Sequence, residues 1–185
     1  RFLKERGYKY LFGIDPSVES IELLNRSGIQ GKVGNIFGEI HKELKGKFDV
    51  VACTEVLEHI YDLKEAILIL QMYLKEDGYL FIDVPAVEGF EGNLLPIANY
   101  FNYEHINYFG IHALDNLLGR FGYRRMNSRV DSYGRVVLHN KKEELCIRAI
   151  YHKTPNENNS VVDVESRQAI CNYFTKINEK NHELA

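Results

Sequence analysis

A short apolar run that ends in acidic residues and a histidine constrains this chain more than any other stretch. Residues 48–53 read Phe-Asp-Val-Val-Ala-Cys, and residues 54–60 continue as Thr-Glu-Val-Leu-Glu-His-Ile. Such a run, continuously apolar after its aspartate, is typical of a parallel strand that is covered on both faces. The polar residues that follow would then lie at the carboxyl end of the strand, where open α/β sheets bind their ligands.

Two further apolar segments show the same alternation of strand and helix signals. Residues 8–14 lead to Asp15, and Ser17 is placed to cap the helix that follows. Residues 79–84 form another buried strand, preceded by a segment with helical spacing of its apolar residues. Strands that alternate with helices predict an α/β fold with a mostly parallel sheet and helices on both faces. Residues 124–152 turn to a β pattern, which predicts a C-terminal antiparallel hairpin.

The composition is that of an ordinary globular chain with one main domain. It has 185 residues, 45% apolar and 26% charged, with a net charge of −3 and a pI near 6.2. Because lysines and arginines are scattered, we expect neither nucleic acid nor an anionic membrane surface as a partner. No apolar run approaches the ~20 residues of a membrane span. Three widely spaced cysteines fit reduced thiols, which favours a cytoplasmic location.

Three parts are expected along the chain. Residues 1–152 form the main domain, residues 153–165 a polar linker, and residues 166–185 an amphipathic C-terminal helix, for which continuation into further sequence is left open. In a dinucleotide-type fold, an acidic residue that ends the second strand lies about 20 residues after a glycine-rich turn. Only fourteen residues precede Asp15. We therefore expect the first strand and its glycine loop to be missing, although a complete domain of another topology is the alternative.

Two motifs resemble the class I S-adenosylmethionine-dependent methyltransferases. They are Gly13-Ile14-Asp15-Pro16-Ser17 and the tract from Cys53 to His59. The resemblance implies a Rossmann-like fold and a site for S-adenosylmethionine at the strand ends. It places Asp15 with Pro16 at the ribose hydroxyls, whereas the residues alone also allow a turn aspartate. It places the cofactor's methionine part against a second group of residues, which are Cys53, Thr54, Glu55 and His59.

The adenine position departs from the family pattern. Asn35-Ile36 stands where the family usually has an acidic residue that meets the adenine amino group. An amide carbonyl can accept the same hydrogen bond, but an ordinary loop is equally compatible with the neighbouring glycines. A second departure is Gly110, where relatives often have serine.

A metal is a further expectation that the tract leaves open. If a helix begins at Glu55, then Glu55, Glu58 and His59 share one face and offer two carboxylates and an imidazole. The tract resembles quinone-precursor O-methyltransferases in this respect. The alternative is a solvated helix start, which attracts glutamates through the helix dipole.

The segment from Tyr103 to Phe109 resembles the Glu-His-x-x-x-Phe element of many small-molecule and sugar C-methyltransferases. The resemblance places His105 against the acceptor, where it is the candidate base, and Glu104 beside it to orient it or bind substrate. Imidazole is the natural base at neutral pH; the alternative is a histidine satisfied by the backbone. The expected wall of the acceptor pocket is aromatic: Tyr100, Phe101, Tyr103, Tyr108 and Phe109.

The resulting prediction is methyl transfer from S-adenosylmethionine to a small-molecule acceptor that is sugar-like, polyketide-like or quinone-like. One rival is a nicotinamide-dependent oxidoreductase, since an acid after the second strand also suits an adenosine ribose. The other is a non-catalytic domain that keeps the fold without the pocket. The sequence does not indicate an oligomeric state.

Overall fold

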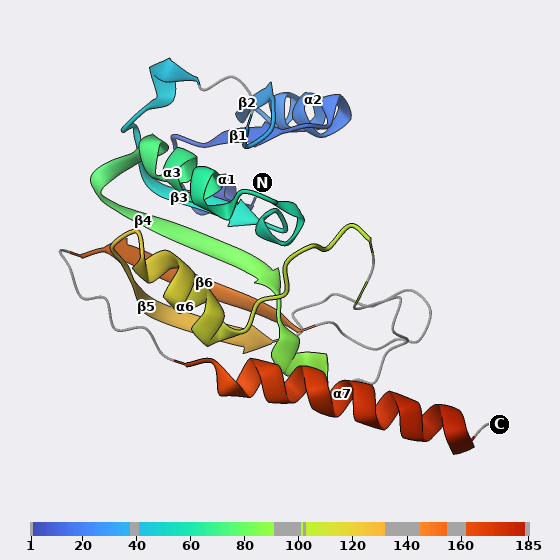
Figure 1. The fold of residues 1–185 in the computed structure, drawn as a ribbon. Helices are drawn as coiled ribbons and strands as arrows, with labels where there is room; N and C mark the ends of the chain where they lie inside the picture. The colour runs from blue at the N-terminus through green and yellow to red at the C-terminus, as the bar shows by residue number, and fades with distance from the viewer. Residues whose placement is uncertain are drawn as a thin grey trace. The chain divides into compact units, whose positions relative to one another are not determined.

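The computed structural model describes residues 2–37, 41–90, 101, 103–131, 145–154 and 162–183 (Figure 1). The chain forms two compact units, Arg1–Glu43 and Leu44–Ala185. Among the described helices, none combines the length and the apolar character that a membrane span requires.

The first unit is a small crossover motif of two parallel strands. Its elements in chain order are α1 (Phe2–Glu5), β1 (Phe12–Asp15), α2 (Val18–Arg26) and β2 (Gln30–Val33). Strands β1 and β2 pair in parallel, with Phe12 opposite Gln30. The predicted cap is confirmed, because Ser17 Oγ accepts a hydrogen bond of 3.1 Å from the Ser20 N–H. Gly28 ends the helix in the left-handed region at φ +74°.

Helix α2 lies close against this two-stranded sheet. Ile21 is buried at 5% exposure. A Cβ atom added at Gly31 would lie 3.1 Å from the Ile21 side chain and 2.9 Å from that of Leu24. The close approach of helix and strand therefore depends on the absence of a side chain at this glycine.

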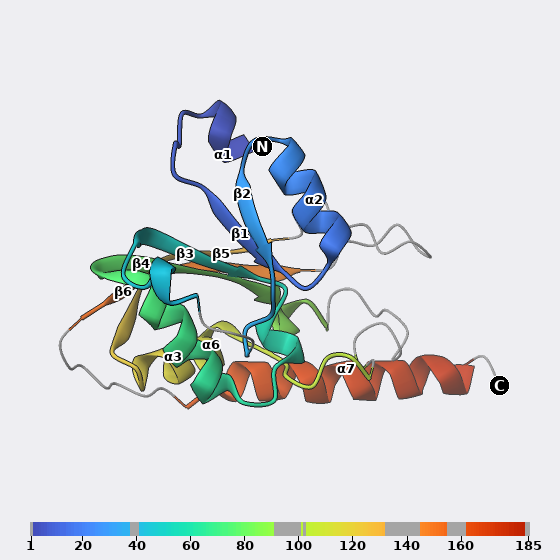
Figure 2. The ribbon, with the colours of Figure 1, turned by 90° about the horizontal axis from the view of Figure 1, so that it is seen from above.

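The second unit holds a four-stranded mixed sheet in the order β3-β4-β6-β5. Strands β3 and β4 are parallel, while β6 runs antiparallel to both β4 and β5. Helices α3 and α6 cover the same face of this sheet (Figure 2). The α/β fold and the antiparallel C-terminal hairpin predicted from the sequence are confirmed. The elements are η1 (Lys42–Leu44, which begins in the first unit), β3 (Phe48–Thr54), η2 (Leu57–His59), α3 (Leu63–Tyr73), β4 (Leu74–Pro85), η3 (Val87–Gly89), α6 (Ile111–Gly119), β5 (Tyr123–Asp131), β6 (Cys146–Lys153) and α7 (Val164–Glu183).

The core of this unit is centred on β4. Leu80, Ile82 and Val84 alternate along that strand with no exposure at all. Strand β3, which was predicted to be covered on both faces, is instead an edge strand of the described sheet. Val50 is 55% exposed, so that prediction was wrong for this strand. The apolar run correctly predicted a strand at this position. The burial of that strand depends on which other elements pack against it, and the run itself does not indicate them.

The C-terminal helix is joined to the rest of the second unit at its start. The Asp163 carboxylate accepts from the Ser166 N–H at 2.9 Å and from the Ala113 N–H at 3.0 Å, so one side chain caps both α7 and α6. Tyr173 and Ile177 of α7 are buried in a cluster with Val87 and Phe90. Much of the predicted linker, at 155–161, lies outside the described residues.

A buried polar network fixes the hairpin to α6. Tyr151 of β6 is fully buried, and its hydroxyl donates to Asp115 Oδ1 at 2.8 Å. Arg125 of β5 lies 3.0 Å from the same carboxylate. Burial, followed by the Asp115 charge, raises the pKa of Tyr151 well above its usual value. Three elements are thus held by one carboxylate.

We predict that Tyr151→Phe destabilises the protein by about 2 kcal/mol, because a buried hydrogen bond to a charged group is lost. The matched control is Tyr61→Phe, because Tyr61 is 94% exposed. This substitution should change the free energy of unfolding by no more than about 0.5 kcal/mol. Urea unfolding followed by circular dichroism measures both. Equal stability of the two variants would contradict the role given to the network.

Candidate functional site

The chain turns sharply at the carboxyl end of β3. Cys53 is buried at 4% exposure, whereas Thr54 and Glu55 are exposed. Glu55 has a φ of +56°, the only positive φ among the described residues other than glycine. Its N–H donates to the carbonyl of Asp83 on β4 at 2.9 Å. A left-handed glutamate at a strand end is a costly conformation of the kind that clusters at functional sites.

The expected helix starting at Glu55 is not formed. After the left-handed residue comes the short 3-10 turn η2, Leu57–His59, and α3 begins only at Leu63. Asp62 caps that helix by accepting from the Glu65 N–H at 2.9 Å. The prediction that Glu55 shares a helix face with Glu58 and His59 was therefore wrong, because its backbone conformation interrupts a helical path.

Asn107 ties a distant segment to this turn. Its side-chain amide donates to the carbonyl of Leu57 at 2.9 Å and to that of Ile60 at 2.6 Å. Leu57 is the first residue of η2 and Ile60 follows its last residue, so a single side chain is hydrogen-bonded to both ends of the turn. Asparagine suits this position because its NH₂ group carries two donors.

Backbone hydrogen bonds complete the attachment. The N–H groups of Ile106 and Asn107 both donate to the carbonyl of Glu58, at 2.9 and 3.0 Å. His59 Nδ1 lies 2.8 Å from the carbonyl oxygen of Glu104. These five hydrogen bonds, which join residues 104–107 to residues 57–60, are here named the clasp. The clasp brings the two sequence motifs together in the second unit.

The clasp places His105 against His59. Their ring centroids are 4.8 Å apart with an interplanar angle of 70°. His59 is 39% exposed at its side chain, and its Nε2 lies 3.9 Å from Oε1 of Glu58, which is 2% exposed. The structure brings His59, His105 and Glu104 together, and Glu104 takes part in the clasp through its carbonyl. The roles predicted for these residues stay predictions.

The surroundings of His105 lower the pKa of its imidazole. Partial burial lowers its pKa below the ordinary 6.5, and the charge of His59 lowers it further. The Glu104 carboxylate acts in the opposite direction and is the smallest of the three effects. A neutral imidazole at pH 7 can accept a proton, as a base requires.

The same group offers a set of metal-type donors. Glu58, His59 and His105 each present one such atom, all within 4.8 Å of one another. Among the described residues this is the group that forms, and Glu55 is not part of it. One carboxylate with two imidazoles suits a divalent transition metal, and the same atoms also suit a shared proton.

In the first unit, the Asp15 side chain stabilises the turn that follows β1. Its Oδ1 accepts from the Ser17 N–H at 2.8 Å, which uses one of the two carboxylate oxygens. Asn35 accepts likewise from the Phe37 N–H at 2.9 Å. Pro16 is exposed and Ile36 half-buried. The ribose and adenine roles of these residues stay predictions.

The aromatic residues divide into two sets. Phe101 and Tyr108 pack at 4.8 Å between ring centroids, and both lie against Phe90. Tyr103, by contrast, is 92% exposed, and Phe109 is buried at 5%. Tyr100 lies outside the described residues. Of the residues predicted to form the pocket wall, Phe101 and Tyr108 therefore pack against the buried cluster that contains Tyr173 of α7.

Sequence reasoning missed Asn107 and the ion pair between Asp83 and Arg148. Asp83 is 9% exposed, and Arg148 Nε lies 3.2 Å from its Oδ2. A single aspartate inside an apolar strand is a signal that could have found it. Gly110 also has a structural reason, because a Cβ atom there would collide with the Ser166 side chain.

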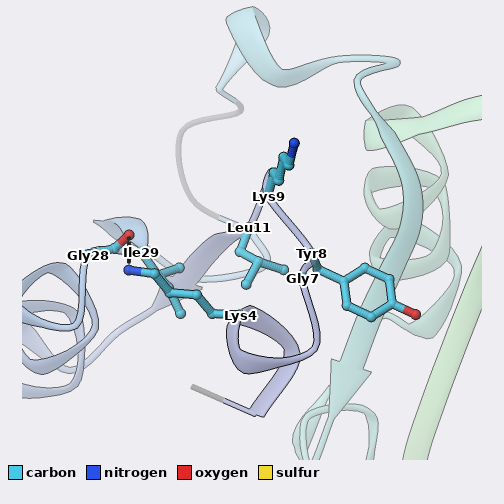
Figure 3. Close-up of a pocket in the computed structure, with 7 residues that line it drawn as sticks. All are labelled: Lys4, Gly7, Tyr8, Lys9, Leu11, Gly28 and Ile29. Carbon is cyan, nitrogen blue, oxygen red and sulfur yellow. Dashed lines mark hydrogen bonds between the residues drawn. The ribbon is translucent and has the colours of Figure 1, made fainter.

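A hollow of about 310 Å³ lies in the first unit (Figure 3). Lys4 reaches from it to the C-terminal end of α2, donating to the carbonyls of Ser27 at 2.8 Å and Gly28 at 3.2 Å. A cation at that helix end is stabilising. The lining is Lys4, Gly7, Tyr8, Lys9, Leu11, Gly28 and Ile29, none of which the motifs include.

One comparison with known proteins identifies a family. A family described as a methyltransferase domain matches residues 1–126. A search of the curated proteins found no match.

Solved structures share the fold at low identity. A SAM-dependent methyltransferase from Methanosarcina mazei is 18% identical, covering 84% of this chain and 86% of that one with a TM-score of 0.63. An S-adenosylmethionine-dependent methyltransferase from Mesorhizobium loti is 11% identical, with coverages of 83% and 84% and a TM-score of 0.62. A Burkholderia thailandensis 1,6-didemethyltoxoflavin-N1-methyltransferase, with bound 1,6-didemethyltoxoflavin and S-adenosylhomocysteine, is 16% identical, with coverages of 83% and 65% and a TM-score of 0.58.

We predict that the Cys53 thiol at the strand end resists alkylation. Burial raises its pKa to about 12, and the Glu58 charge adds to the effect, while the reactive species is the thiolate. Iodoacetamide at pH 8 should label the exposed Cys171 and leave Cys53 unlabelled until the protein is unfolded. Peptide mass spectrometry separates the two sites. Labelling of Cys53 as fast as Cys171 would refute the buried placement.

Proposed function

Because the chain belongs to the methyltransferase-domain family, we propose that it transfers the methyl group of S-adenosylmethionine to a small-molecule acceptor. The family match spans residues 1–126, which include both motifs that resemble class I enzymes. The observation that supports the site most directly is the clasp. It holds His105, the candidate base, beside the turn that follows β3.

The cofactor is proposed to lie at the carboxyl ends of the parallel strands. Asp15, with Pro16 after it, would meet the ribose hydroxyls, and Asn35-Ile36 would meet the adenine. At β3, Cys53, Thr54 and Glu55 would present backbone groups to the methionine part, with His59 alongside. The left-handed conformation of Glu55 supports this proposal, since strained backbone of this kind clusters at functional sites.

The chemistry asks little of the protein beyond position and a base. The acceptor's nucleophilic atom bonds to the methyl carbon as the sulfur–methyl bond breaks, and S-adenosylhomocysteine leaves. The acceptor's proton passes to His105. Holding donor and acceptor at near-attack distance supplies much of the rate, and a positioned base adds roughly 10²–10⁴-fold.

The acceptor is proposed to be a flat or ring-containing small molecule of the sugar, polyketide-like or quinone-like classes. Phe101 and Tyr108 lie close in sequence to His105 and pack on each other. Aromatic faces of this kind suit apolar ring surfaces. The Burkholderia structure that shares this fold holds 1,6-didemethyltoxoflavin together with S-adenosylhomocysteine.

We predict that His105→Gln lowers kcat for methyl transfer by about 10²-fold or more, because proton removal loses its base. The affinity for S-adenosylhomocysteine should change less than about twofold. Transfer of the labelled methyl group to a panel of phenolic, sugar and β-diketone acceptors measures the first, and calorimetry the second.

His112→Gln is the matched control, since its ring pairs with Glu165 across the start of α6 and α7. It should retain methyl transfer. If His105→Gln keeps full activity on an acceptor that the unaltered protein methylates, His105 is not the base.

A further inference from the structure

Three aromatic rings of the second unit form a row that is partly open to solvent. Tyr108 and Phe101 pack at 4.8 Å between ring centroids with an interplanar angle of 40°. On its other side, Phe101 packs with Phe174 of α7 at 5.1 Å and 31°. Phe101 and Tyr108 are half-buried, and Phe174 is 38% exposed. These three rings are here named the ring row.

Two buried rings support the ring row. Phe90 is 3% exposed, and Tyr173 of α7 is fully buried. Phe90 meets Phe101 edge to face, at 5.4 Å and 76°. Tyr173 lies 6.0 Å from Phe101 and 5.5 Å from Phe174 between ring centroids. Because aromatic pairs at these distances attract one another, the buried rings fix the positions of the partly exposed ones.

Phe174 lies at the margin of the buried stripe of α7. Ile170, Tyr173 and Ile177 recur at helical spacing and pack in or against the buried cluster beside η3 (Figure 1). Phe174 follows Tyr173 directly and keeps more than a third of its surface exposed, while its ring contacts Phe101. The stripe accounts for the attachment of α7, and Phe174 adds an aromatic surface beside it.

The start of α7 is fixed next to the segment that carries His105. The Asp163 carboxylate caps both α7 and α6, and α6 begins two residues after Phe109. A Cβ atom at Gly110 would collide with the Ser166 side chain of α7, so helix and segment approach closely at this glycine. Helix α7 is therefore a built part of the second unit at both its start and its aromatic stripe.

The ring row adjoins the proposed base along the chain. Phe101 lies four residues before His105 and Tyr108 three residues after it, and the clasp holds the backbone between them. Small-molecule sites are typically lined by aromatic side chains of this kind. Residues 76–119 contain no lysine or arginine, so this segment offers no cationic side chain to a phosphate or carboxylate. The surroundings therefore suit an uncharged ring.

We propose that α7 completes the acceptor site, with Phe174 as a specificity-determining residue whose ring, together with those of Phe101 and Tyr108, binds an uncharged planar ring. This role deepens the proposed function, and it rests on that function for the identification of the bound ring as the methyl acceptor. The binding of the ring itself is a property of the folded protein and is measured without methyl transfer.

The first test is a binding measurement. The probe is 2-naphthol, an uncharged two-ring phenol, which is titrated by calorimetry into the full chain with and without S-adenosylhomocysteine. Saturable binding is expected, and Phe174→Ala should weaken it by about fivefold or more because an aromatic contact is lost. Phe174→Tyr keeps the ring and should bind within about twofold of the unaltered protein. No saturable binding to the unaltered protein, or equal binding by Phe174→Ala, would overturn the proposal.

Two further variants separate the ring from the helix that bears it. Val164→Ala alters another exposed apolar residue of α7, which is 61% exposed, and should bind 2-naphthol like the unaltered protein. Phe174→Leu keeps much of the apolar volume without an aromatic face, and it replaces the alanine variant if urea unfolding shows that one to be unfolded. It should also bind more weakly. A loss in Val164→Ala as large as in the Phe174 variants would contradict a specific role of the ring.

The charge of the ligand is tested with 6-hydroxy-2-naphthoate, which has the same two rings and a carboxylate. It should bind several-fold more weakly than 2-naphthol, because the carboxylate loses water without gaining a cationic partner. Equal or tighter binding of the carboxylate would overturn the assignment of an uncharged ligand.

The catalytic consequence is a selective change in KM. For a phenolic acceptor, Phe174→Ala should raise KM by about fivefold or more and change kcat by less than about twofold, since the ring row binds ground and transition states alike. For an open-chain β-diketone, KM should change by less than about twofold. An equal rise in KM for both acceptors would contradict recognition of a ring.

Failure of this inference and failure of the proposed function give different results. If 2-naphthol binding depends on Phe174 while no acceptor is methylated, the proposed function fails and the ring-binding role of α7 stands. If phenolic acceptors are methylated with the same KM in Phe174→Ala as in the unaltered protein, the proposed function stands and the role of α7 is refuted.

Discussion

The site depends on the clasp, in which residues 104–107 are hydrogen-bonded to residues 57–60. The segment that bears His105 has no helix or strand of its own for residues 103–107. Its position is set by what it contacts, and most of those contacts pass through Asn107 and the carbonyl of Glu104. Five hydrogen bonds to one short turn hold the backbone on both sides of His105, which limits where its ring can lie. Positioning of this kind, not intrinsic reactivity, is what a methyl transfer from an already activated donor requires.

The turn itself is prepared by β3 and β4. Glu55 leaves β3 in a left-handed conformation and donates to the Asp83 carbonyl, so the next residues form η2 in place of a continuous helix. In this turn the Leu57 carbonyl accepts from the Ile60 N–H at 3.3 Å and also from the Asn107 amide, and the Ile60 carbonyl accepts from the same amide. The strained residue and the clasp therefore act together. Glu55 redirects the chain at the strand end, and the clasp adds hydrogen bonds to the carbonyls of the turn that follows.

Much of the fold could be predicted because local patterns determine it. Ser17 and Asp62 cap their helices as their side chains favour, and the strand formers near the C-terminus do form an antiparallel pair. For the site, a family resemblance pointed to His59 and His105, which the structure places side by side, and their roles stay predictions. What could not be predicted rests on long-range contacts or unusual dihedrals. The helix expected to begin at Glu55 is not formed, because the positive φ of this residue interrupts a helical path. Nothing near Asn107 in the sequence indicates that its side chain is hydrogen-bonded to a residue fifty positions away.

The central claim is that the protein binds a methyl donor and not a nicotinamide dinucleotide. Calorimetric titration of the purified protein with S-adenosylhomocysteine and, separately, with NAD tests it most directly. The account predicts saturable binding of S-adenosylhomocysteine that Asp15→Ala weakens by at least about tenfold, through lost hydrogen bonds to the ribose, and no binding of NAD. Binding of NAD with no response to S-adenosylhomocysteine would contradict the account.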